Sequence, residues 1–292
     1  MSDVGRQLYD AGFEGWGHSI AGYVTDYLLS LTCIVCFVYV ITQRRPLADA
    51  ASVSTSFLVF LGFEAVAFLA GGITHHVLDT YFRSGEVMGR TWNSWNSGWM
   101  PFWMIAMFCS PLATMALNCV VFIFKNYPPW TTYLSYSIGV VASVCECWLV
   151  YHAKFSSSGT VNSALAIGTC VLAGVLLLQG FEIGPQGGRA FMLWGMLLRL
   201  VGFLVLALAP NSCKQVDSFR DGCPFPENFN QNAVFHSLLI VATIAQCKAV
   251  IDRDVSEYFS SPQLRYRDVK AQFDDSGPGR RGDCRSCQCA VQ

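Results

Sequence analysis

Seven long apolar stretches dominate the sequence and limit what the chain can fold into. Each is long enough to cross a hydrocarbon core about 30 Å thick, which takes roughly 20 helical residues. Helices and closed barrels satisfy every backbone hydrogen bond in a bilayer, and the sequence has no alternating pattern typical of a barrel. It therefore predicts an all-α, seven-helix transmembrane bundle, with helices at residues 23–42, 53–73, 100–124, 131–151, 161–181, 190–209 and 233–250.

The composition agrees with a membrane protein. Hydrophobic residues make up 53% of the 292 residues and charged residues 13%, whereas soluble domains carry roughly 25% charged residues. So little charge disfavours a soluble enzyme, a nucleic-acid-binding protein and a disordered protein. We expect an N-terminal lumenal segment at 1–22, with no evident signal peptide, a seven-helix domain at 23–250 and a cytosolic tail at 251–292.

Lysine and arginine placement predicts the orientation of the bundle. Twelve of these residues fall on the side of the tail and six on the other side, which favours a cytosolic C-terminus and a lumenal or extracellular N-terminus. Cys213 and Cys223 lie in the loop before the last helix, on the predicted lumenal side. An oxidising compartment would let them form a disulfide; the alternative is two unpaired thiols.

The C-terminus carries a candidate lipidation signal. Cys289-Ala290-Val291-Gln292 fits the C-a-a-X pattern for prenylation, with the last residue favouring farnesyl, and Cys284 and Cys287 are candidates for S-palmitoylation. The last nine residues, 284–292, resemble the tails of Ras-type small GTPases. The alternative is that the C-a-a-X pattern occurs here by chance. The signal implies a prenyl-transferase, a prenyl-binding carrier and a eukaryotic membrane, either the plasma membrane or an endomembrane.

Several ionisable residues fall inside the predicted helices, where they are costly and commonly functional. Glu64 and Arg199 lie at matching depths in the second and sixth helices and predict a buried pair. Glu146 lies in the lumenal half of the fourth helix without an obvious cationic partner in the sequence, and Asp26 lies near the lumenal end of the first. A transporter or channel that uses Glu64, Glu146 and Arg199 is one hypothesis.

Histidines gather at the lumenal ends of the second and seventh helices. His75 and Asp79 are four residues apart, as are Asn232 and His236, so each pair shares a helix face, and His76 adds a third imidazole. Imidazoles from two helices with a nearby carboxylate are the parts of a zinc site, to which Asn232 would add only a weak ligand through its amide carbonyl. The alternatives are a b-type haem, or interfacial histidines that hydrogen-bond to loops.

This plan resembles the superfamily of alkaline ceramidases and progestin/adiponectin receptors, in which S-x-x-x-H ends the second helix and H-x-x-x-H opens the seventh. The resemblance implies zinc held by His75 or His76 and by His236, with zinc-bound water attacking a lipid amide. Glycine stands at the family's serine position, and Asn232 replaces the first histidine of the seventh helix. The chain would therefore be a relative that has lost or rebuilt the hydrolase site.

Three functional hypotheses remain open. The first is a membrane protein whose lumenal-side cavity binds a lipid or small ligand, with zinc and with Asp79 or Glu64 orienting water if the site is hydrolytic. The second is a non-enzymatic receptor, sensor or scaffold whose output is the lipidated tail. The third is the transporter or channel named above. Membrane lipids are expected partners in all three, and nucleic acid in none.

Overall fold

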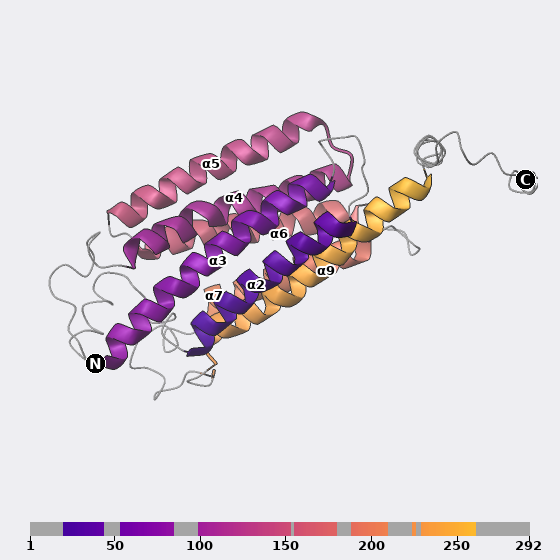
Figure 1. Ribbon diagram of the computed structural model, residues 1–292. Coiled ribbons are helices and arrows are strands. Elements are labelled where there is room, and N and C mark those ends of the chain that lie inside the picture. Colours follow the sequence, from indigo (N-terminus) through magenta and orange to yellow (C-terminus); the bar gives the residue numbers. More distant parts are fainter. Residues whose placement is uncertain are drawn as a thin grey trace, which may run out of the picture.

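The computed structural model describes residues 20–43, 53–84, 99–152, 155–179, 188–209, 224–225 and 229–260. In these ranges the chain forms seven helices and no strand (Figure 1). The all-α, seven-helix architecture is therefore confirmed. The helices are α2 (Ile20–Gln43), α3 (Val53–Ser84), α4 (Met100–Phe124), α5 (Pro129–Tyr151), α6 (Phe155–Leu178), α7 (Arg189–Leu208) and α9 (Gln231–Ser260).

All seven helices are long and apolar enough to cross a membrane. The outer surface of α5 shows how well the bundle fits a bilayer. Trp130 and Tyr133 are exposed near its start, and Trp148 and Tyr151 are exposed near its end. Eighteen residues separate Trp130 from Trp148 and Tyr133 from Tyr151, which is about 27 Å along a helix that rises ~1.5 Å per residue. The two aromatic girdles are thus spaced like the two interfaces of a membrane.

Successive helices run in opposite directions, so α2 and α9 are parallel (Figure 1). We call the end of the bundle at which α2 begins the proximal end and the opposite end the distal end. Six helices pack as a closed ring in the order α2, α3, α4, α6, α7, α9, and α9 returns to α2. Helix α5 packs outside this ring, mainly on α4 and less extensively on α6.

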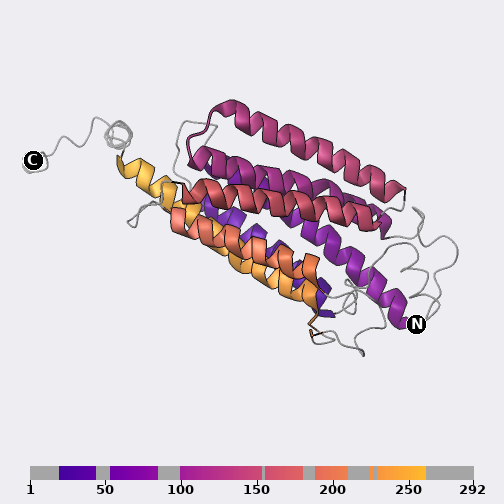
Figure 2. The same cartoon turned by 180° about the vertical axis from the view of Figure 1, so that it is seen from behind.

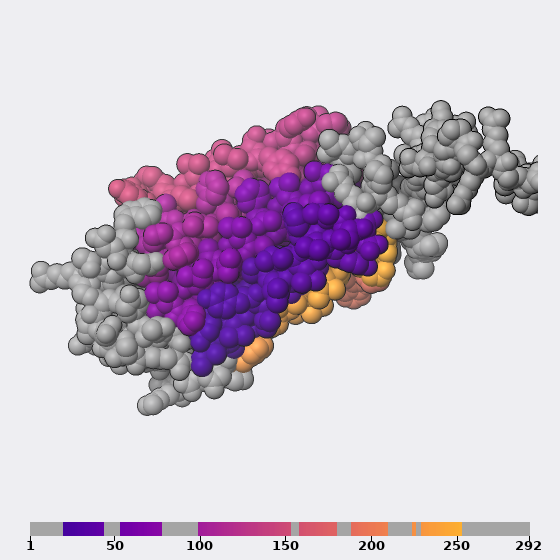
Figure 3. All heavy atoms as spheres, in the orientation of Figure 1, coloured from indigo at the N-terminus to yellow at the C-terminus, as the bar shows by residue number. Residues whose placement is uncertain are grey.

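The two faces of the molecule differ in the helices that they show. Figure 3 shows indigo α2 and pink α5 on opposite sides of one face, with α3 and α4 between them. The view from behind shows α6 and α7 on the other face (Figure 2). The exposed surface of these helices is rich in large apolar side chains, as expected for a surface that faces lipid.

Two helices are longer than their apolar stretches. Helix α3 continues to Ser84, although the span suited to a membrane ends at Val77, and α9 continues to Ser260, although its span ends at Asp252. Gly85 and Pro262, the next residues that disfavour a helix, follow these two ends closely in the sequence. Hydropathy therefore marks where the apolar part of each helix stops, and both helices continue past that point.

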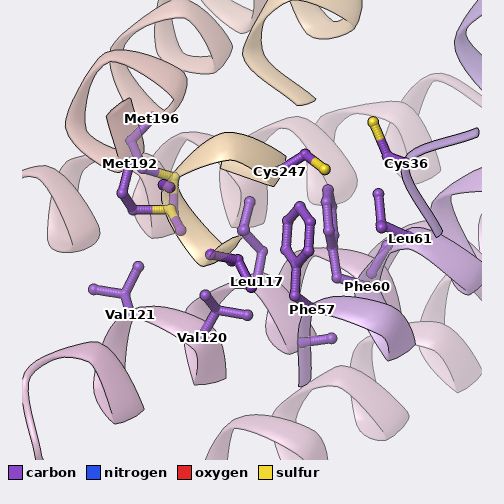
Figure 4. Close-up of a cluster of buried hydrophobic side chains, with 14 of the residues drawn as sticks. Cys36, Phe57, Phe60, Leu61, Leu117, Val120, Val121, Met192, Met196 and Cys247 are labelled. Atoms are coloured by element: carbon purple, nitrogen blue, oxygen red, sulfur yellow. The ribbon is translucent and has the colours of Figure 1, made fainter. Parts of the chain in front are cut away.

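The apolar core fills the distal half of the ring. Phe57, Phe60 and Leu61 of α3 meet Leu117 of α4 and Met196 of α7 there (Figure 4). Close helix approach completes the packing, because a Cβ atom on Gly195 of α7 would lie 2.5 Å from Cγ of Gln246. The proximal half holds most of the buried ionisable groups instead, which makes it the place to look for a functional site.

Candidate functional site

Asp26 of α2 and His236 of α9 face each other inside the proximal half. Oδ1 of Asp26 lies 3.1 Å from Nε2 of His236, and both side chains are almost fully buried. The ring of Phe68 contacts the imidazole of His236 edge-on, with 5.3 Å between the ring centroids. Burial and this aromatic contact hold the imidazole in one orientation.

The contact with Thr25 indicates which nitrogen of His236 carries a proton. Its Oγ1 donates to a backbone carbonyl, since it lies 2.6 Å from the oxygen of Ala21 and 2.9 Å from that of Gly22. Oγ1 also lies 3.1 Å from Nδ1 of His236, so it accepts the Nδ1–H. A neutral imidazole then has a bare lone pair on Nε2. That lone pair faces a carboxylate oxygen of Asp26, an arrangement that a proton or a metal ion between the two atoms would stabilise.

His75 of α3 approaches the same carboxylate from a second direction. Its Nε2 lies 3.9 Å from Oδ2 of Asp26, and the ring of Trp103 contacts it edge-on at 5.8 Å between centroids. Oδ2 of Asp26 and Nδ1 of His75 are buried and make no hydrogen bond within the described part of the chain. Buried polar atoms are nearly always satisfied, so these two indicate a missing partner.

A cavity of about 100 Å³ adjoins this cluster. It is large enough for several water molecules or for a small ligand group. Six helices contribute to its walls, and α5 does not. Its polar lining consists of Asp26, His75, Ser110, Asn162, Ser163, Asn232 and His236.

The cavity wall also includes amide and hydroxyl groups from α4, α6 and α9. Ser110 of α4 donates to Oδ1 of Asn162 on α6 over 3.0 Å. Asn232 lies in the first turn of α9. The side chain of Asn230 caps this helix, because its Oδ1 accepts the backbone N–H of Ala233 at 3.1 Å. Nδ2 of Asn232 is buried without a hydrogen bond in the described residues. The cavity therefore offers a donor near the two imidazoles.

Asp26, His75 and His236 have the donor chemistry of a zinc site, but they are not yet arranged as one. Among the described residues, no group of three or more His, Cys, Asp or Glu side chains has metal-site geometry. The N–O distances of 3.1 and 3.9 Å bracket the about 3.3 Å between ligands of a tetrahedron with bonds of about 2.0–2.1 Å. The two N–O distances therefore lie near the value that a shared metal ion would require.

The structure separates the two adjacent histidines that the sequence placed together. His76 is exposed and stacks on Tyr23, with 4.5 Å between ring centroids and 9° between the ring planes. Consecutive helical residues point about 100° apart, so His75 alone reaches the cavity, and His76 drops out of the candidate ligands. The side chain of Asp79, the predicted catalytic carboxylate, lies outside the described residues.

Glu64 and Arg199 form an ion pair in the middle of the bundle. Arg199 donates to both carboxylate oxygens of Glu64, at 2.8 and 3.1 Å, and also to Gln246 at 2.9 Å and to Thr243 at 2.7 Å. All three guanidinium nitrogens donate into this network, and the ring of Phe60 covers the guanidinium group. Glu64 is therefore engaged in an interhelical clamp and is not placed to orient water at the histidines.

A smaller cavity of about 30 Å³ connects the clamp to the site. Glu64 and Arg199 line it, together with Thr114 and Thr169. It shares the wall residues Ala67, Phe68, Ser110 and Phe203 with the larger cavity. The two spaces therefore adjoin along α3, from the mid-membrane ion pair to the imidazoles.

Two predicted features fall outside the described residues. These are the disulfide between Cys213 and Cys223 and the lipidation cysteines Cys284, Cys287 and Cys289. Both remain predictions from the sequence.

Residues 21–255 match a family whose description reads "Family of unknown function (DUF6962)". The chain belongs to this family. No curated protein matches the chain, and no solved structure does. The match covers all seven helices, so membership applies to the whole bundle, and the function must be argued from the site.

Sequence reasoning did not connect Asp26 and Thr25 with the histidines. A usable signal was present, because Asp26 is the single charged residue between Ile20 and Gln43, and an intramembrane carboxylate marks a functional site by default. Nothing in the sequence places α2 beside α9. That contact decides which carboxylate meets the imidazoles.

Proposed function

We propose that this membrane protein binds a divalent metal ion, with zinc the best match to the donors, through Asp26, His75 and His236. The adjoining cavity would then receive a lipid or another small ligand. One observation carries the proposal: two buried imidazole nitrogens converge on one buried carboxylate at the wall of a cavity.

A metal explains more of the site than a single proton does. A proton could satisfy the contact between Nε2 of His236 and Oδ1 of Asp26, but His75 and Oδ2 of Asp26 would stay unpaired. A metal ion would use Nε2 of both imidazoles and the carboxylate at once, while Nδ1 of His75 would need a separate partner. Thr25 supports this reading, because a metal-binding histidine usually gives its other N–H to an oxygen that fixes the ring.

If the site is catalytic, we propose hydrolysis of a lipid amide, the reaction of the ceramidase-type proteins that the sequence resembles. A bound zinc ion would polarise water or a carbonyl group. Asp26, His75 and His236 would hold the ion, and the amide of Asn232 would donate to an oxygen of the ligand. Asn232 thus acts here as a ligand-facing donor, whereas the sequence suggested a weak metal ligand.

We also propose a topology for the bundle. The charge pattern of the sequence favours the proximal end, with the site, on the lumenal or extracellular side, and a C-terminus in the cytosol. Prenylation of Cys289 would then attach the tail to the same membrane that the seven helices already span.

Metal analysis of the purified full-length chain tests the metal proposal. We expect about one zinc per chain, lost in Asp26→Asn and in His236→Ala. His76→Ala is the matched control, since it removes an exposed imidazole one residue from the end of the span, and it should keep the metal. Absence of zinc, cobalt, iron and manganese from a folded wild-type chain reconstituted with each ion would overturn the proposal.

A further inference from the structure

Glu146 of α5 is the most isolated ionisable group in the described part of the bundle. Its side chain is fully buried within the membrane-spanning length of α5. Neither carboxyl oxygen has a hydrogen-bond partner among the described residues. The Glu64–Arg199 ion pair and the cluster of Asp26, His75 and His236 each have polar partners close to their side chains. Glu146 has none in the part of the chain that the structure describes and therefore needs a separate explanation.

Contacts on both sides of Glu146 fix it against α4. Ser143 donates to the carbonyl of Phe108 at 2.7 Å, and the thiol of Cys147 lies 3.8 Å from the carbonyl oxygen of Met104. One turn further on, Val150 is fully buried in an apolar cluster that includes Trp99 and Met100. The carboxyl group is therefore held in a closely packed and apolar helix interface.

The helices around Glu146 offer it no opposite charge. Neither α4 nor α6, the two helices on which α5 packs, contains an Asp, Glu, His, Lys or Arg residue. Their titratable groups are the thiols Cys109 and Cys119 on α4 and Cys170 on α6. Helix α5 itself adds the thiols Cys145 and Cys147 and the phenols Tyr133, Tyr136 and Tyr151. None of these is a cation that could pair with a carboxylate.

An ionised carboxylate without a partner costs several kcal/mol in an apolar interior, far more than a neutral carboxylic acid. The packing that the structure shows is thus compatible with the protonated form of Glu146. We infer that Glu146 is an intramembrane proton-binding site, and that α5 stays seated on α4 only while Glu146 holds its proton.

The position of α5 would let the protonation of Glu146 affect the packing of other helices. Helix α5 lies outside the ring (Figure 1) and has the smallest share of its span buried, together with α7. Helix α4, on which it rests, supplies Trp103, Met107 and Ser110 to the wall of the larger cavity. Release of the proton would loosen α5 and, through α4, that wall. This inference does not depend on whether the site binds a metal.

Infrared spectroscopy of the full chain in lipid nanodiscs tests the proton directly. At neutral pH the wild type should show the carbonyl band of a protonated carboxylic acid, and Glu146→Gln should lose it. Glu64→Gln is the matched control and should keep the band, because Glu64 is an ion-paired carboxylate. If Glu146→Gln does not fold, Glu146→Met serves the same purpose. A wild type without this band, or a band of undiminished intensity in both Glu146 variants, would overturn the inference.

Thermal stability tests the seating of α5. Ionisation of Glu146 opposes the packed state, so the wild-type melting temperature should fall by several degrees as the pH rises from about 6 to about 9, a range clear of the carboxyl groups in water. Glu146→Gln cannot ionise and should lose this component of the fall. Identical pH profiles for the two proteins would show that the proton does not control α5.

Discussion

Asp26 and His236 are 210 positions apart in the sequence, and Oδ1 of one lies 3.1 Å from Nε2 of the other. The contact joins the first and last helices of the bundle, which run parallel and close the six-helix ring. The same packing that closes the ring thus brings a carboxylate from α2 to an imidazole from α9. The closure of the ring and the proposed metal site therefore both depend on the interface between α2 and α9.

Thr25→Val should weaken metal binding without unfolding the protein. The substitution keeps the shape of the side chain but removes the oxygen that accepts the Nδ1–H of His236. Loss of such a partner typically costs about 10–100-fold in metal affinity. Competition with a zinc chelator on the purified chain measures the change.

Thr25→Ser is the matched control, since it keeps the hydroxyl group and should retain an affinity near that of the wild type. Equal zinc affinity in the valine and serine variants would contradict the role given to Thr25.

Arg199→Met should destabilise the bundle by about 3–5 kcal/mol, because it leaves Glu64 as an uncompensated buried charge. The double variant Glu64→Gln/Arg199→Met should recover much of this loss, since no ionised group remains. Reversible unfolding in mixed micelles gives the free energies of unfolding. If the double variant is as unstable as the sum of the two single variants, the two residues are not coupled.

Gly195→Ala should disturb the packing of α7 on α9. A Cβ atom there would lie 2.5 Å from Cγ of Gln246 and 3.0 Å from the carbonyl oxygen of Ala242, and overpacking of this kind costs about 1–3 kcal/mol. Gly62→Ala is the matched control, because its Cβ would meet no atom within 4 Å. It should be neutral or stabilising by up to about 1 kcal/mol. Melting temperatures of the two variants, compared in the same detergent, check the difference, and equal values would contradict it.

Cys289→Ser should leave the chain inserted in the membrane but change its destination in a eukaryotic cell. Seven spanning helices anchor the protein without a lipid, so the lipid acts on sorting or on the tail. Mass spectrometry of the C-terminal peptide and fluorescence imaging of the tagged chain measure the two effects.

Gln292→Leu is the informative companion variant, since it should exchange a farnesyl for a geranylgeranyl group. An unmodified Cys289 in the wild type expressed in such cells would contradict the prediction.

The sequence predicted the helices well, because each is a local run of apolar residues whose length must match the membrane. It also paired Glu64 with Arg199 correctly in space, since both lie at the same depth in their helices. It grouped His76 with His75, although one is exposed and the other buried, because a position in sequence does not state which face of a helix turns inward. Hydropathy also missed the ends of α3 and α9, which continue as helices beyond their apolar spans.

By itself, then, the sequence determined an all-α membrane bundle and the depth of each polar residue. These properties follow from the contact of each segment with lipid or water, which local composition controls. The tertiary structure alone decided that α2 lies beside α9, that Asp26 completes the pair of histidines and that Glu146 faces a helix without charge. Those facts depend on which helix faces meet, and that is set by the packing of all seven helices together.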